Sequence, residues 1–323
     1  MVKASQGLRA ADVLALGLNA IVGSGIFLFP GQLAALTGPA SVAVFLVTAL
    51  LLAPVALCYA ELGGMYSGSG GSYLYAREAF GERVGFGVGA LAWAAALLSW
   101  AAVASLLAGH MAWLHPVFGV SWVGRLTAAS VLALLGFVNR RGIRPAAWTV
   151  DALTVAKLLP LFAFVVLCLP RADPSRFVPF AGGEGRFGYA VFLALWALQG
   201  FEVVPVPAGE AEDAARSVPK AVLGSLAVAA VLYALIQAAA VGVHPGLAAS
   251  AERPLADAAR AALGPWGETL LAGGGLLSML GFLAGAALGE PRYLSALGER
   301  HFRGWRLDET DPETGVPSRA IAA

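Results

Sequence analysis

Two of the long apolar stretches in this sequence are interrupted near their centres. The first, residues 11–38, contains Gly-Ser-Gly at residues 23–25, and the second, residues 188–209, contains Gln-Gly at residues 199–200 with two prolines beyond. In hydrocarbon an unpaired backbone N–H or C=O costs several kcal/mol, so irregular backbone persists only where it lines a cavity or meets a ligand. Two such breaks at corresponding places in a chain point to a solute site near the middle of a membrane.

The composition supports an integral membrane protein. Hydrophobic residues make up 59% of the 323 and charged residues only 13%, whereas a soluble chain carries about a quarter charged residues. Spanning helices need about 20 mostly apolar residues. Eight stretches qualify: residues 11–36, 40–62, 84–109, 122–139, 146–169, 188–208, 219–243 and 266–290. None shows strand-like alternation, so we predict an all-α fold.

Positive residues predict the orientation, because cytoplasmic loops are enriched in Lys and Arg. With the N-terminus inside, fourteen Lys and Arg fall in inner segments and six in outer ones, and Lys157 lies within a span. We therefore predict a multi-pass protein of the cell membrane with a cytoplasmic N-terminus. The net charge of +1 gives no reason to expect a nucleic acid partner. The lipid bilayer is the expected surrounding, and a homo-oligomer is left open.

Two connecting segments have a composition of their own. Residues 63–81 are rich in Gly and Ser, so we expect a loop that leads into the third span. After Glu290, basic and apolar residues recur at helical spacing, which predicts an interfacial helix on the cytoplasmic membrane surface. Residues 307–312 are then expected to form a solvated loop, and residues 315–323 resemble the beginning of another helix.

The break at Gly23, Ser24 and Gly25 suits a zwitterion. Glycine lets the backbone leave helical geometry and approach a ligand closely. The half-helix that begins near Ile26 points its amides and positive dipole end at the gap, which suits a carboxylate. The half-helix that ends near Val22 offers free carbonyls, which suit an ammonium group or a cation. The alternative is a small-residue face that packs against another helix.

The second break brings aromatic and acidic residues together. Trp196 and Phe201 flank Gln199 and Gly200, and the two rings could close over a solute. Glu202 follows within the membrane, where carboxylates are usually functional. A protonated or hydrogen-bonded structural carboxyl is the alternative for Glu202, and a lipid-facing or core aromatic is the alternative for Trp196.

Lys157 lies near the centre of the fifth span. Either end is roughly 18 Å away at 1.5 Å per residue, too far for the lysine stem to reach the interface. A charged lysine at the midplane costs at least ~2.5–3.5 kcal/mol. Lys157 must therefore pair with carbonyls or a carboxylate, or lose its proton, and together with Glu202 it is a candidate for proton coupling. A permanent ion pair within the bundle is the alternative.

Other kinds of chemistry find no support in the sequence. The four histidines lie near span ends without metal-ligand spacing, and Cys58 and Cys168 lie in apolar runs, so we expect neither a metal site nor a disulfide. Patterns typical of hydrolases are missing. Residues 68–71 are glycine-rich but lack the strand, the helix and the Gly-Lys-Ser/Thr of a phosphate loop. We therefore expect no enzyme, no cofactor and no ATP-driven pump.

Five motifs, taken in order, resemble the amino acid–polyamine–organocation (APC) superfamily of permeases. They are GLNAIVGSGIF at residues 17–27, GGSYLYAR at residues 70–77, NRRG at residues 139–142, GFE at residues 200–202, and PR at residues 291–292 with TGVP at residues 314–317. The resemblance implies a transporter with ten core helices in two inverted five-helix repeats, the first and sixth helices being broken. Residues 1–170 would form the first repeat and residues 171–290 a partial second repeat. Residues 291–323 would form the interfacial helix and a loop that leads to a missing ninth span.

The resemblance also implies roles for residues at the two breaks. The substrate carboxylate would meet the amides of Ser24 and Gly25. The amino group would meet carbonyls near Ile21, Trp196 and Gln199. The family implies secondary active transport of amino acids by alternating access.

Lys157 matches the position at which proton-coupled members carry a lysine in place of a sodium ion, so proton symport is the favoured coupling. Because the expected lining is apolar and aromatic, with Glu202 as its one acid, we expect neutral amino acids. Two departures stand out: residues 212–219 lack the Asn-Pro pair common after helix six, and helices nine to twelve are missing, so we expect a C-terminally truncated permease. The alternatives are an exchanger of amino acids or amines, and a truncated, non-transporting fragment.

Overall fold

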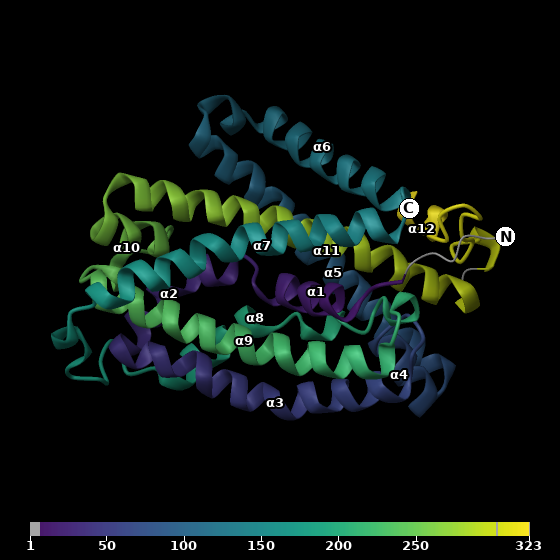
Figure 1. The fold of residues 1–323 in the computed structure, drawn as a ribbon, viewed down its shortest axis with the longest axis horizontal. Coiled ribbons are helices and arrows are strands. Elements are labelled where there is room, and N and C mark those ends of the chain that lie inside the picture. The colour runs from purple at the N-terminus through teal and green to yellow at the C-terminus, as the bar shows by residue number, and fades with distance from the viewer. Residues whose placement is uncertain (1–6, 302, 323) are drawn as a thin grey trace.

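The computed structural model describes residues 7–301 and 303–322, and their regular structure is helical (Figure 1), which confirms the all-α prediction. The helices are α1 (Ala10–Ile21), α2 (Gly25–Thr37), α3 (Ser41–Met65), α4 (Ser72–Phe80), α5 (Glu82–Leu114), α6 (Ser121–Arg140), α7 (Ile143–Cys168), α8 (Phe187–Leu198), α9 (Ala214–Val243), α10 (Pro254–Leu263), α11 (Pro265–His301) and α12 (Ser318–Ala322). Two short 3-10 turns, η5 (Phe201–Val203) and η6 (Ala208–Glu210), follow α8.

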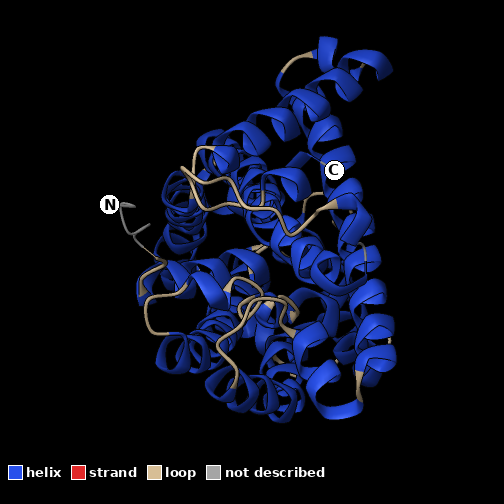
Figure 2. Ribbon diagram, turned by 90° about the vertical axis from the view of Figure 1, so that its right-hand side faces the viewer, coloured by secondary structure: helices blue, strands red, loops and turns tan. Residues whose placement is uncertain are grey.

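The long helices form a bundle in which their axes run side by side (Figure 1). α3 packs against α9, α9 against α1, and α7 against α11. The shorter helices α1, α2 and α8 lie among the long ones. α5 runs behind the bundle against α11, and its far end projects with α6 on one side. Figure 2 looks along the bundle, so that most helices are seen nearly end-on. The short helices are thus held on several sides by long ones.

Burial distinguishes the central helix from the outermost one. Of the most apolar 18-residue stretch of α9, 67% is buried inside the protein, whereas the corresponding share in α6 is 6%. Small residues let α9 approach its neighbours: a Cβ added to Gly17 of α1 would lie 2.8 Å from the Oγ of Ser225 in α9. Such close approach is how helices associate in lipid, where apolar surface alone gives no preference for protein over lipid. α9 is therefore the centre of the bundle, and α6 is exposed to its surroundings.

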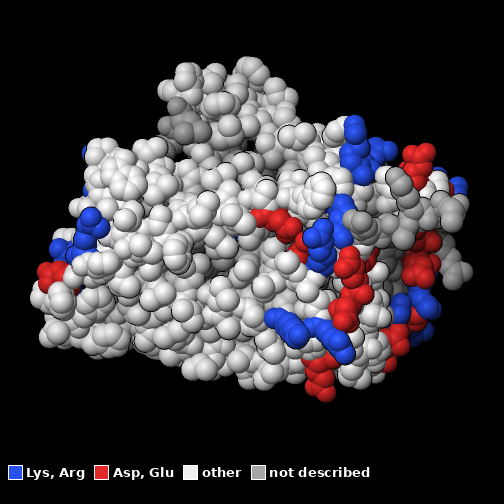
Figure 3. All heavy atoms as spheres, viewed as in Figure 1, with Lys and Arg blue, Asp and Glu red and all other residues white. Residues whose placement is uncertain are grey.

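The distribution of charge agrees with a membrane protein. On the face shown in Figure 3, charged side chains gather towards the end that holds the chain termini, with a smaller group at the opposite end, and a broad uncharged band lies between them. Within the described residues, six helical stretches are long and apolar enough to cross a membrane. α1 and α8 are shorter apolar helices. α1 is the part of the first interrupted span that precedes its break, and α8 is the part of the second that precedes its break.

The glycine-rich segment is more helical than we predicted. α3 continues to Met65 and α4 begins at Ser72, so the predicted loop over residues 63–81 shrinks to residues 66–71. The side chains of Tyr73 and Tyr75 on α4 are buried. Burial of these aromatic rings stabilises α4 by more than the weak helix propensity of its flanking glycines and serines costs.

The segment after Glu290 does not form the separate interfacial helix that we predicted, because α11 continues through it. Pro291 has no N–H, which leaves the carbonyl of Ala287 without its helical partner. The side-chain amide of Asn139 in α6 donates to that carbonyl instead. Leu297, beyond the proline, is buried inside the protein. The segment is therefore part of the bundle. α12 lies within the stretch predicted to begin another helix.

The second interrupted span does not return to α-helix after its break. α8 ends at Leu198, and residues 199–213 run through turns that include η5 and η6. Pro205 and Pro207 supply no backbone N–H to a helical ladder. The predicted span over residues 188–208 is thus a helix followed by irregular backbone.

Candidate functional site

The first break is a tight turn between α1 and α2. Val22 has φ −76° and ψ 75°, and the amide of Gly23 donates to the carbonyl of Ile21 at 2.8 Å, which is an inverse γ-turn. In the part of the chain that the structure describes, the amides of Ser24, Gly25 and Ile26 have no hydrogen-bond acceptor. These unpaired donors, at the positive end of the α2 dipole, favour an anionic group.

The carbonyls at the end of α1 are occupied by side chains from three other helices. Lys157 of α7 donates its Nζ to the carbonyls of Asn19 at 2.7 Å and Val22 at 2.6 Å. Tyr233 of α9 donates to the carbonyl of Ile21 at 2.9 Å. Ser278 of α11 donates to the carbonyls of Val22 and Gly23 at 3.1 and 3.0 Å. The carbonyls that we expected to be free are therefore already paired.

Lys157 is fully buried, and the structure gives it carbonyls as hydrogen-bond partners. These carbonyls lie at the C-terminal end of α1, where the negative end of the helix dipole favours a cation. Asn19 adds a link between α1 and α11, because its side-chain amide donates to the carbonyl of Gly281 at 2.6 Å. Lys157 and Asn19 thus hold the end of α1 against α7 and α11.

The second break presses directly against the first. Gly200 has φ +128°, a conformation that glycine adopts readily and other residues rarely do. A Cβ added to Gly200 would lie 2.6 Å from the carbonyl carbon of Ala20. A Cβ added to Gly25 would lie 3.2 Å from the Cα of Ala197. The backbones of the two interrupted spans therefore touch on both sides of the crossing.

The family model described as amino acid permease matches residues 8–323. The chain belongs to the amino acid permease family. This family is part of the APC superfamily, which is a superfamily of transporters and not of enzymes, and the family has an inverted-repeat fold. The permease is therefore a multi-pass membrane protein.

Curated relatives of this chain are identical to it at a little over a quarter of the aligned positions. It is 28% identical to a human protein named cationic amino acid transporter 4, over 96% of this chain and 52% of that protein. It is 29% identical to the branched-chain amino acid permease BcaP of Lactococcus lactis, over 75% of this chain and 57% of that protein. An uncharacterized transporter of Mycobacterium tuberculosis is 28% identical over 90% of this chain. The chain spans between half and two thirds of the length of these relatives.

The aromatic residues of the permease lie on different sides of the second break. Trp196 is 53% exposed and packs edge-on against Phe29 of α2, with ring centroids 5.5 Å apart. Phe201 is buried and meets Tyr59 of α3 edge-on at 6.0 Å. Gln199 is exposed. Trp196 therefore lies near the α2 end of the first break, whereas Phe201 belongs to the packed interior.

Glu202 contributes to the backbone geometry of the break. Its Oε2 accepts a hydrogen bond from the amide of Gly200 at 2.8 Å. This bond satisfies one backbone donor where α8 has ended and no helical acceptor is available. The carboxyl group thus shapes the second break.

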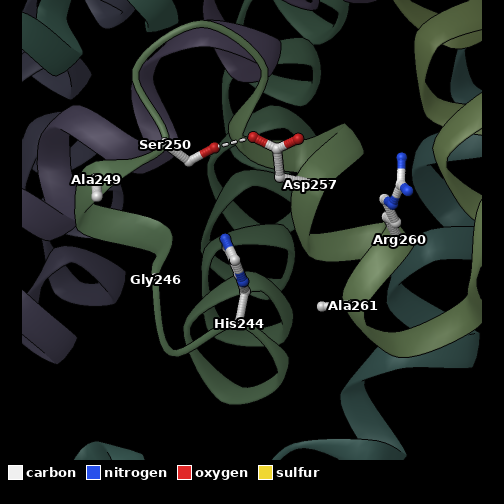
Figure 4. Close-up of a pocket in the computed structure, with 7 residues that line it drawn as sticks. All are labelled: His244, Gly246, Ala249, Ser250, Asp257, Arg260 and Ala261. Carbon is white, nitrogen blue, oxygen red and sulfur yellow. Dashed lines mark hydrogen bonds between the residues drawn. The ribbon is translucent and has the colours of Figure 1, made fainter.

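Two hollows lie at the ends of the bundle. The first, of about 590 Å³, is formed by α10, the end of α9 and the loop between them, and Figure 4 shows Ser250 donating to Asp257 above His244. Burial lowers the pKa of His244, so its ring is neutral at pH 7. The second, of about 370 Å³, lies where α4, η6 and α11 meet the segment after α11. Neither hollow is lined by a residue of the two breaks.

Sequence reasoning missed three residues that hold the first break: Asn19, Tyr233 and Ser278. Each is a polar residue within an otherwise apolar stretch, and polar groups inside membrane spans are usually functional or paired. That signal marks all three. It does not give their partners, because the hydrogen bonds join residues 212 or more positions apart in the chain.

Proposed function

We propose that this permease binds an amino acid between the two breaks and carries it across the membrane by alternating access. The observation that carries the proposal is the backbone contact between the breaks, Gly200 against Ala20 and Gly25 against Ala197. Irregular backbone at membrane depth is tolerated where it meets a ligand or lines a cavity. The proposed arrangement has residues 1–170 as the first repeat and residues 171–290 as a partial second repeat, with the N-terminus in the cytoplasm.

The substrate carboxylate is proposed to bind the unpaired amides of Ser24 and Gly25, with Gly23 permitting close approach. Because Gly200 has no side chain, the backbones of the two breaks can cross in contact with each other. The carbonyl of Ile21 already accepts hydrogen bonds from Gly23 and Tyr233, and a carbonyl oxygen has two lone pairs. Ile21 therefore shapes the site in this conformation.

The amino group is proposed to meet the carbonyls near Trp196 and Gln199, at the C-terminal end of α8. The last carbonyls of a helix lack intrahelical partners, and the negative dipole end favours a cation. Trp196 is proposed to cover the substrate, since it is exposed and lies beside Gly25. Phe201 is proposed to support the other side of the site through its contact with Tyr59.

Proton symport is the proposed coupling, with Lys157 and Glu202 as the proton-coupling residues. Lys157 joins α7 to the carbonyls of α1 next to the break, so a change in its charge alters the hold on α1. Glu202 bonds the amide of Gly200, so protonation of its carboxyl group weakens the hold on the second break. A change in the protonation of either group thus changes the hydrogen bonds that hold one of the two breaks.

Neutral amino acids are the proposed substrates, because Glu202, the acid beside the breaks, already accepts a backbone amide. The relative from Lactococcus lactis, named a branched-chain amino acid permease, is compatible with this. Cationic amino acids are the second candidate, because the human relative is named a cationic amino acid transporter. The two candidates differ in whether Glu202 is available to a positive side chain.

Thermal unfolding of the purified permease in detergent tests the binding proposal. Saturating L-leucine is expected to raise Tm by a few degrees, because a ligand that binds only the folded state stabilises it. Leucine methyl ester and 4-methylpentanoate, which lack the free carboxylate and the amino group respectively, are expected to have no effect. Stabilisation by L-arginine alone would favour the cationic candidate. Equal stabilisation by leucine and its ester would contradict the carboxylate site.

Replacing Tyr233 with phenylalanine is expected to weaken substrate binding by roughly fivefold, because a typical hydrogen bond contributes ~1 kcal/mol. The variant loses the hydroxyl that donates to the Ile21 carbonyl. It keeps the aromatic ring, which packs edge-on against Phe45 with ring centroids 5.3 Å apart. Ligand titration of the thermal shift gives the affinity. Tyr189→Phe, at a 45% exposed position of α8, is the control. An unchanged affinity in Tyr233→Phe would show that this hydroxyl does not position the site.

A further inference from the structure

The segment before α1 and the segment after the second break are joined at one end of the bundle. The amide of Leu8 donates to the carbonyl of Glu210 at 2.7 Å, and the amide of Glu212 donates to the carbonyl of Leu8 at 2.9 Å. Leu8 is 2% exposed. The segments next to these ends of the two interrupted spans are therefore tied together by backbone pairing, and they form one structural unit.

Arg144 of α7 ties this unit to the rest of the bundle. Its Nη1 lies 3.1 Å from the Oδ2 of Asp12 in α1, and its Nη2 lies 2.9 Å from the Oε1 of Glu212. One guanidinium group thus bridges both interrupted spans to α7. The carboxylate of Asp12 is nearly buried, whereas that of Glu212 is about half exposed.

Arg292 of α11 makes a second and more deeply buried bridge. Its Nε donates to the Oε1 of Glu210 at 2.5 Å and its Nη2 to the Oε2 at 3.3 Å, a bidentate arrangement. Its Nη1 donates to the side-chain oxygen of Asn139 at 3.1 Å and to the carbonyl of Leu288 at 2.6 Å. Arg292 is 2% exposed. Asn139 holds the arginine and, through its amide, the carbonyl freed by Pro291.

The Arg292–Glu210 pair separates open space from packed interior. Both residues line the hollow of about 370 Å³ at this end of the bundle. Behind them, Val206 packs with buried residues of α4 and α11 in one apolar cluster. Solvent that fills the hollow therefore meets the ion pair, whereas Val206 is only 5% exposed.

We propose that Arg144 and Arg292 form the inner gate of this permease, holding the joined ends of the interrupted spans against α7 and α11 until the substrate leaves on that side. The proposal rests on the proposed transport function. Release requires the interrupted spans to part from those two helices, and both arginines bridge that gap. Arg292 dominates, because breaking a buried pair leaves an uncompensated charge, whereas an exposed pair contributes little.

Cysteine accessibility tests the gate without any need for transport. In a background of Cys58→Ser and Cys168→Ala, a single Val206→Cys reports entry of water behind the gate, since Val206 is 5% exposed. The full chain is labelled with a membrane-impermeant maleimide in inside-out vesicles. Arg292→Gln and Glu210→Gln are each expected to speed labelling about tenfold, and the double variant no further, because both remove the same pair. Arg144→Gln is expected to give a smaller increase.

Arg300→Gln is the matched control. Arg300 lies on the same helix and pairs with Glu82 of α5 at 3.0 Å, but both side chains are about half exposed and neither belongs to an interrupted span. Its labelling rate is expected to stay at the parent value. If Arg292→Gln fails to fold, Glu210→Gln decides, since the Glu210 side chain is 24% exposed and tolerates a neutral isostere.

Unchanged labelling in monodisperse Glu210→Gln and Arg292→Gln would overturn the gate, whatever the transport data show. Equal acceleration by Arg300→Gln would overturn it too, since that would indicate general loosening of this end. Faster labelling in the gate variants combined with absence of any amino acid transport by the parent protein would support the gate and count against the proposed function. The two proposals therefore fail separately.

Discussion

Replacing Lys157 with alanine is expected to abolish proton-driven accumulation of amino acid in proteoliposomes, while exchange of internal for external substrate continues. Lys157 is the buried lysine whose Nζ donates to the carbonyls of Asn19 and Val22 beside the first break. Without it, no titratable amine connects α7 to α1. The buried carbonyl of Asn19 also loses its donor, at ~1–3 kcal/mol, whereas that of Val22 keeps Ser278, so a lower Tm is expected.

The control is Lys220→Ala, which removes an exposed lysine near the start of α9. That variant is expected to accumulate substrate at the parent level. Both variants are assayed with labelled leucine under the same inward proton gradient, and counterflow gives the exchange rate. Normal gradient-driven accumulation by Lys157→Ala would refute the coupling role and leave Lys157 as a structural cap of α1.

Replacing Gly200 with alanine is expected to reduce transport by more than about a hundredfold. The strained φ costs ~1–3 kcal/mol, and overlap with packed neighbours adds ~1–3 kcal/mol. Both apply at this position, because φ is +128° and a Cβ would lie 2.6 Å from the carbonyl carbon of Ala20, a backbone atom that cannot turn aside. The variant must separate the two breaks or distort one of them. Initial uptake rate and Tm measure the effect.

Gly188→Ala supplies the comparison within α8. A Cβ at Gly188 meets nothing within 4 Å, and alanine favours helix over glycine. Its uptake and Tm are expected to equal or slightly exceed those of the parent. If Gly200→Ala transports as well as Gly188→Ala, contact between the two breaks is not required for the site.

The positions of the breaks could be predicted because glycine and proline act locally. Gly23, Gly25 and Gly200 interrupt apolar stretches that would otherwise be continuous, and all three lie where the helices end or begin. The pairing of Lys157 could be predicted only as a class, carbonyl or carboxylate, because a buried charge needs a partner whose identity depends on tertiary packing.

Other features depend on contacts between distant residues and could not be predicted. α11 continues past Pro291 because Asn139, 148 positions from Ala287, donates to the carbonyl that the proline leaves free. The amphipathic spacing beyond Pro291 is equally typical of a surface helix and of a helix packed on one side, so the interfacial prediction failed. The carbonyls at the end of α1 were expected to be free for the same reason: Tyr233 and Ser278 reach them from helices that the local pattern does not place.

The most direct test of the central claim is accumulation of labelled L-leucine by the purified permease in proteoliposomes, measured with an inward proton gradient and again after a protonophore. We predict accumulation above the external concentration that collapses when the protonophore is added. Equilibration at the same rate and to the same level with and without the gradient would contradict proton symport by this chain.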